Sequence, residues 1–105
     1  SGLRAVLHSL RDRLPPEVAI KLGAQLPILM RGIYYEKWHV AGTPTKERHV
    51  DEFLEHVAKE LPQQFPAHPL MVARGVFEIL WQMLDPGEFE KVMHHLPEQI
   101  RALKA

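Results

Sequence analysis

Seven histidines are the side chains with the broadest chemical potential, because imidazole binds metal ions and changes charge near physiological pH. His49, Glu52 and His56 are three and four residues apart, so a helix would place two nitrogen ligands and one oxygen ligand on one face. A zinc site needs three or four convergent ligands with supporting hydrogen bonds, and no further ligand pair has a matching spacing. We therefore interpret this face as solvated, and we predict neither a bound metal nor a cofactor.

Nucleophilic catalysis has little support in the sequence. The chain has no cysteine, and its only serines are Ser1 and Ser9, neither of which lies in a G-x-S-x-G turn. The phosphate-binding patterns G-x-x-x-x-G-K-[ST] and G-x-G-x-x-G are absent. Neighbouring carboxylates such as Asp51 and Glu52 lie where a helix is expected to begin, and the helix dipole explains them without acid–base chemistry. We expect a protein without catalytic activity.

The two halves of the chain differ in charge although the whole is neutral. Residues 1–48 contain eight Lys and Arg against four Asp and Glu, while residues 49–105 contain five against nine. A basic half can follow a phosphate backbone, but a domain of neutral isoelectric point lacks the usual basic footprint of nucleic-acid binding. Nucleic-acid association is therefore our alternative hypothesis. It would use Arg4, Arg11, Arg13, Lys21, Arg31, Lys37, Lys46 and Arg48.

Helical periodicity dominates the first half. An amphipathic stripe predicts a helix that ends near Leu14 and buries Leu3, Val6, Leu7, Leu10 and Leu14. Pro15-Pro16-Glu17 is typical of the first turn of a second helix. Pro27 ends this second helix and begins a third, from Ile28 to about Trp38. Among the polar residues of the first helix, His8 is isolated, and we interpret it as a surface residue. A loop is expected over 39–48.

The second half repeats this pattern. Residues 50–61 predict a fourth helix, and residues 70–84 predict a fifth whose apolar residues surround the axis, so we expect it to be the central, most buried helix. Trp81 on that helix is expected in the core. Asp85-Pro86-Gly87-Glu88 matches a capping box at the start of a sixth helix, and a short last helix reaches about Lys104.

An internal repeat has an offset of 70 residues. Residues 4–31 laid without gaps over 74–101 give nine identities in 28 positions, in register with the prolines. We predict an all-α, compact helical bundle of two pseudo-repeated helix-turn-helix units in a single domain over 1–105. Unit one covers about 3–38 and unit two about 49–105. The identical pairs are Arg4/Arg74, Val6/Val76, Leu10/Leu80, Leu14/Leu84, Pro16/Pro86, Lys21/Lys91, Leu26/Leu96, Pro27/Pro97 and Arg31/Arg101.

Unit two is preceded by the predicted helix over 50–61, whereas nothing precedes Leu3 in unit one. We therefore expect the face formed by Leu3, Val6 and Leu7 to be partly bare, and an apolar face is rarely left in water. Three sources could cover it: the helix over 50–61, a segment before residue 1, or a second chain, which would make a homodimer.

The runs LRAVLHSLRDRLPPE, LGAQLPILMRGIYYEKW, VDEFLEHVAKEL and VFEILWQMLDPGEFEKVMHHLPEQIRAL resemble the bacterial domain-of-unknown-function family 2267. This resemblance covers nearly the whole chain, and its most specific feature is a proline turn followed by a Q-L-P or H-L-P break, used twice. It implies an all-helical bacterial domain and carries no activity, cofactor or catalytic residues. Members of the family have a leading helix before each copy, from which unit one departs.

Aromatic residues gather at the end of the third predicted helix. Tyr34, Tyr35 and Trp38 could anchor a partner, or they could close the edge of the core with their polar atoms in solvent. We predict a non-catalytic protein-interaction or oligomerisation module. The resemblance implies a bacterial protein, and we expect it in the cytoplasm because no long apolar stretch or signal peptide is present. The candidate partner contacts are Leu3, Val6, Leu7, Tyr35 and Trp38.

Overall fold

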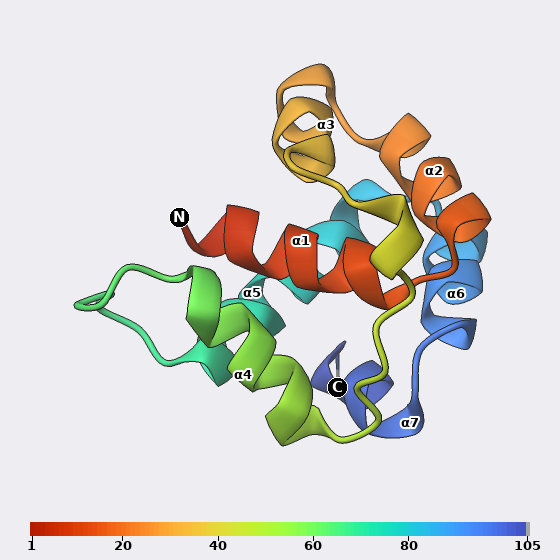
Figure 1. The fold of residues 1–105 in the computed structure, drawn as a ribbon. Helices are drawn as coiled ribbons and strands as arrows, with labels where there is room; N and C mark the ends of the chain where they lie inside the picture. Colours follow the sequence, from red (N-terminus) through yellow and green to blue (C-terminus); the bar gives the residue numbers. More distant parts are fainter. Residues whose placement is uncertain (105) are drawn as a thin grey trace.

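The computed structural model describes residues 1–104, and it confirms the all-α class (Figure 1). No helix within these residues is long and apolar enough to cross a membrane. In the described part of the chain, seven α-helices and two short 3₁₀ helices follow one another as α1 Gly2–Arg13, α2 Pro16–Gln25, α3 Ile28–Tyr35, η1 Val40–Gly42, α4 Val50–Glu60, α5 Pro69–Met83, α6 Pro86–His94, α7 Glu98–Arg101 and η2 Ala102–Lys104.

Prolines determine where several helices end. Leu14, Leu26 and Leu61 each follow the last residue of a helix and adopt extended backbone angles, and a proline comes next in all three cases. The ring of a proline clashes with helical geometry in the preceding residue, so each leucine turns the chain while its side chain stays against the core. The short helices and sharp corners of Figure 1 follow from this spacing.

The backbone reproduces the 70-residue repeat. Pro27 begins α3 with φ −55° and ψ 152°, and Pro97 begins α7 with φ −57° and ψ 151°. The hydrogen bonds at the helix starts and breaks recur in both units. The matched donor–acceptor pairs are Ala19–Pro15 with Phe89–Asp85, Leu26–Gly23 with Leu96–Met93, and Arg31–Pro27 with Arg101–Pro97.

The repeated units pack against each other through equivalent helices. α1 contacts α5 and α2 contacts α6, while α4 packs on both α1 and α5. α3 packs on α1 and α2, and η2 takes the corresponding place on α5. The contact between α2 and α6 uses the same repeat positions on both sides, since Gln25 Nε2 donates to Glu88 Oε2 and one small pocket between them is lined by residues 18, 21, 22 and 25 and by residues 88, 91, 92 and 95. Two equivalent patches that face each other indicate an approximate two-fold axis between the units. α4 is the one long helix of residues 1–104 that has no counterpart.

The central helix is α1, so the prediction that the fifth helix would be the most buried is wrong. Every residue from Ala5 to Arg11 is buried, because α3, α4 and α5 surround α1. On α5, Ala73, Val76, Phe77 and Leu80 reach the core.

The expectation for Trp81 is also wrong, since this side chain is 40% exposed. Its ring lies edge-on against Phe89 and under the ammonium of Lys104, which is 4.9 Å from the ring centroid. Apolar residues all round a helix therefore do not place that helix at the centre of this small domain.

The face of Leu3, Val6 and Leu7 is not bare, which corrects the first part of the predicted contact surface. Val6 and Leu7 are fully buried, and Leu3 is partly buried against the core. α4 packs on both α1 and α5, so one helix serves both units, the first of the three alternatives.

One cap and one helix boundary differ from expectation. Helix α6 begins at Pro86 as predicted, but the Asp85 side chain makes no capping hydrogen bond, so the predicted capping box is wrong. Helix α3 ends at Tyr35 rather than Trp38, because Glu36 leaves helical geometry with ψ 126° and Lys37 follows in a left-handed conformation with φ 55°.

Candidate functional site

Polar side chains on α1 hold the end of α3. The Arg11 guanidinium Nη1 donates to the backbone carbonyls of Tyr34 and Glu36 at 2.8 and 2.7 Å. His8 Nε2 lies 2.7 Å from the Ile33 carbonyl. The last carbonyls of a helix have no partner within it and favour cations, so both side chains act as a C-terminal cap. The prediction that His8 is a surface residue is wrong, because it is 3% exposed.

The same α1 face contacts one carboxylate at the end of α3 and another at the end of α4. His8 Nδ1 lies 2.9 Å from Glu60 Oε1, so each ring nitrogen faces an acceptor, and only an imidazolium can donate to both. Arg4 donates to both carboxylate oxygens of Glu36, and this hydrogen bonding holds the pKa of Glu36 below its usual range. Arg4, His8 and Arg11 form a polar row on α1 that stabilises the packing of α1, α3 and α4.

Several arginines of the basic half are engaged within the domain. Besides Arg4 and Arg11, Arg13 Nε donates to the Glu47 carbonyl at 2.7 Å, which fastens the segment before α4 to α1. Arg31 donates to the carbonyls of Gly23 and of two neighbouring residues at the end of α2. These contacts use the arginines on which a phosphate-binding stripe would depend.

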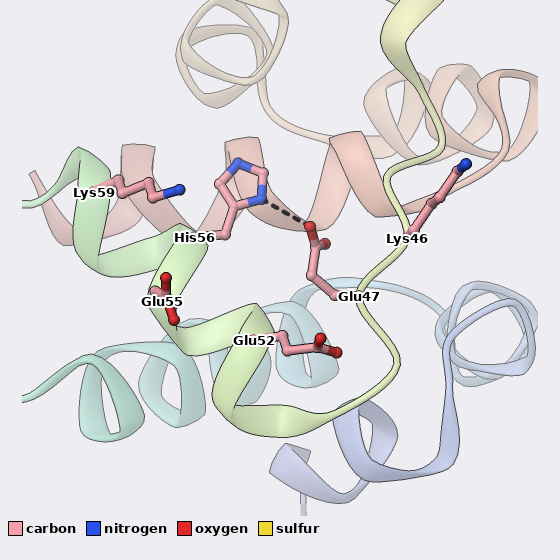
Figure 2. Close-up of a pocket in the computed structure, with 6 residues that line it drawn as sticks. All are labelled: Lys46, Glu47, Glu52, Glu55, His56 and Lys59. Atoms are coloured by element: carbon pink, nitrogen blue, oxygen red, sulfur yellow. Dashed lines mark ion pairs between the residues drawn. The ribbon is translucent and has the colours of Figure 1, made fainter.

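The candidate ligands His49, Glu52 and His56 do not converge on one point. The Glu52 carboxylate accepts hydrogen bonds from the backbone N–H groups of Arg48 and His49, both at 3.1 Å, and these bonds lower the pKa of Glu52. Figure 2 shows Glu52 pointing along the segment that leads into α4, while the His56 ring points toward α1. Among residues 1–104, no group of three potential ligands is placed to hold a metal ion.

His56 instead links α4 to the segment before it and to α1. Its Nδ1 is 3.6 Å from Glu47 Oε2, the dashed contact in Figure 2, and its Nε2 is 3.9 Å from Asp12 Oδ2. The surrounding surface hollow carries charges of both signs and is lined by Lys46, Glu47, Glu52, Glu55, His56 and Lys59. Within it, Glu47 pairs with His56, and the Glu52 carboxylate accepts from backbone N–H groups.

Tyr35 and Trp38, the second part of the predicted contact surface, lie together at the end of α3. Their ring centroids are 5.6 Å apart, and both side chains are partly buried against the core. The Tyr35 hydroxyl donates to the Ile20 carbonyl at 3.3 Å. The Tyr35 ring lies so close to Gly23 that an added Cβ would be 2.6 Å from Cζ. Much of this pair is engaged in joining α3 to α2.

Larger exposed apolar side chains occur elsewhere. Met71, Gly75, Ile79 and Met83 recur at four-residue intervals on α5 and are all exposed; we call this row the α5 outer face. At the start of α3, Leu29 is 83% exposed. Sequence reasoning missed these positions because it assigned apolar residues of α5 to the core. The repeat alignment could not have found them, since it pairs Gly75 and Ile79 with Ala5 and Ser9, which are completely buried on α1.

Comparison with known proteins gives one match. The description of the matching family is "Uncharacterized conserved protein (DUF2267)", and its sequence pattern covers residues 1–103. Among curated proteins, none matches the chain. The resemblance noted in the sequence is thereby confirmed over nearly all 105 residues: the chain belongs to the DUF2267 family of uncharacterized conserved proteins.

Proposed function

We propose that this domain is a non-catalytic protein-interaction module that binds through the α5 outer face and through the exposed Leu29 at the start of α3. One observation carries the proposal: Met71, Ile79 and Met83 are 67, 46 and 37% exposed on a single helix face. Apolar side chains gathered on one surface of a soluble domain are typical of contact sites. Exposed apolar residues scattered one by one would carry no such meaning.

The alternative, nucleic-acid association, has weaker support. Arg4, Arg11, Arg13 and Arg31 make hydrogen bonds to carboxylates or backbone carbonyls of the same chain. A guanidinium held in this way has fewer donors left for phosphate oxygens. Protein interaction remains the proposal because its surface consists of side chains that contribute little to the core.

Site-specific photo-cross-linking in the cells that make the protein tests this function. A photoreactive residue replaces Ile79 in one variant and Val40 in the control, since both side chains are 46% exposed and only Ile79 lies on α5. We expect a discrete adduct from position 79 and none from position 40. An adduct of twice the chain mass would identify self-association, and a different mass would identify another protein by mass spectrometry. Absence of any adduct from position 79 contradicts the proposal.

A further inference from the structure

The inference begins with how α4 covers α1. Glu60 of α4 contacts His8 at 2.9 Å, and His56 of α4 approaches Asp12 at 3.9 Å. Positions 5, 8, 9 and 12 share one face of a helix, and on this face Ala5 and Ser9 are fully buried. α4 therefore lies along the face of α1 that these residues form.

The approximate two-fold axis relates this covered face to the α5 outer face, which is open to solvent. The positions equivalent to Ala5, His8, Ser9 and Asp12 are Gly75, Glu78, Ile79 and Gln82, and all four are exposed. The Glu78 side chain, 49% exposed, touches η2 through Lys104 at 3.2 Å, as His8 touches the end of α3. The equivalent face is therefore present in unit two with different side chains, and no helix of residues 1–104 covers it.

The residue that contacts the start of α4 also has an exposed equivalent in the other unit. In unit two, Gln99 Oε1 accepts a hydrogen bond of 2.9 Å from the backbone N–H of Val50, where α4 begins. The equivalent position in unit one is Leu29, whose side chain is 83% exposed. A helix related to α4 by the two-fold axis would therefore begin near Leu29 and end near Glu78.

We propose that an amphipathic helix of a second protein docks here, in the orientation that the two-fold axis derives from α4. This inference rests on the proposed function and names the class of partner. Charge defines the end of the helix: α4 places the Glu60 carboxylate against the His8 imidazole, whereas the docked helix would meet the Glu78 carboxylate, which Lys104 contacts through Oε2. We expect Lys or Arg at that position of the docked helix, because it can pair with the same carboxylate. A second copy of the chain fits poorly, because its α4 already buries Phe53 and Val57 in its own core.

The probes are two peptides built from residues 48–62 of this chain, one with the natural Glu60 and one with Glu60→Lys. A lactam between Glu55 and Lys59, which are exposed and four residues apart, holds both peptides helical, since short helices are otherwise marginal in water. Calorimetry measures their binding to the intact protein. The protein variants are Glu78→Lys, Ile79→Asp and, as the matched control, Ile20→Asp, an isoleucine of similar exposure on α2.

The natural protein should bind the Glu60→Lys peptide about fivefold more tightly than the peptide with the natural Glu60, because an exposed ion pair replaces a repulsion. Glu78→Lys should reverse this preference. Ile79→Asp should weaken binding at least about tenfold by placing a charge in the apolar contact, while Ile20→Asp should leave it unchanged.

Two results would overturn the inference: no binding of either peptide at about 1 mM, or a preference that Glu78→Lys fails to reverse. If neither peptide binds but position 79 gives a cross-linked adduct, the proposal of an interaction module would be supported and only the proposal of a helical partner would be refuted. Absence of both would remove the proposed function as well.

Discussion

Replacement of Arg11 by methionine tests whether the polar row of α1 holds α3 in place. The guanidinium is 3% exposed and donates to the Tyr34 carbonyl, the Glu36 carbonyl and Asp12 Oδ1. Methionine fills similar space but leaves the buried Tyr34 carbonyl without this partner, and hydrogen bonds to charged groups contribute about 1.5–3 kcal/mol each. Asp12 and the Glu36 carbonyl are nearer solvent and recover part of their loss. We expect Arg11→Met to lower the free energy of unfolding by about 3 kcal/mol.

Urea unfolding followed by circular dichroism measures this change, and thermal unfolding should show a midpoint about 15 °C lower. Arg11→Lys keeps the charge without the planar fork and should fall between the wild type and Arg11→Met. The control is Arg48→Met, an exposed position in the same half, with an expected change within about 0.5 kcal/mol. An Arg11→Met variant as stable as this control would refute the capping role of α1.

Tests at three further positions, Tyr34, Gly23 and Glu52, examine other parts of the fold. Tyr34 is buried and its hydroxyl donates to the Ala19 carbonyl, so Tyr34→Phe should cost about 1–2 kcal/mol in urea unfolding. Burial raises the pKa of Tyr34 above its ordinary value of 10.0, so the contribution of this residue to stability is complete below pH 10.0 and falls as pH rises. In Tyr35→Phe protein, Tyr34 is the one remaining tyrosine, and its phenolate absorbance at 295 nm should appear only when the protein unfolds. Gly23→Ala should cost about 1–3 kcal/mol because its Cβ would meet the Tyr35 ring, and the Gly23→Ala/Tyr35→Ala pair should cost less than the sum of both changes. Hydrogen bonds from two backbone N–H groups lower the pKa of Glu52, so its ionised carboxylate contributes fully to stability above the ordinary pKa of 4.5, and this contribution is lost as pH falls further. In Glu52→Gln protein, the free energy of unfolding should therefore decrease less steeply with acid pH.

Much of the fold could be predicted because the leucine and proline residues at the helix ends recur at an offset of 70 residues. The Leu-x-Pro step at Leu14 and the Leu-Pro step at Leu26 lie where helices end, and their recurrence at Leu84 and Leu96 predicts the same corners in unit two. On α6, Phe89, Val92 and Met93 follow helical spacing and are buried.

Residues whose environment depends on other helices could not be predicted. His8 and Arg11 look like surface residues in the sequence, but α3 ends above them, and its free carbonyls need cations. Trp81 and Ile79 look like core residues, but no helix of residues 1–104 covers them on α5. The periodicity of one helix records how apolar it is, whereas burial depends on which neighbours cover it.

The most direct test of the α5 outer face as a binding surface is a methyl NMR titration of the intact protein with the lactam-held Glu60→Lys peptide. Isoleucine, leucine, valine and methionine methyl groups are labelled, so Met71, Ile79 and Leu29 report on the proposed surface and Ile20 and Val40 on the rest of the domain. We predict saturable shifts at Met71, Ile79 and Leu29 and constant positions at Ile20 and Val40. Shifts confined to Ile20 or Val40, or no saturable shift at Ile79, would contradict the account.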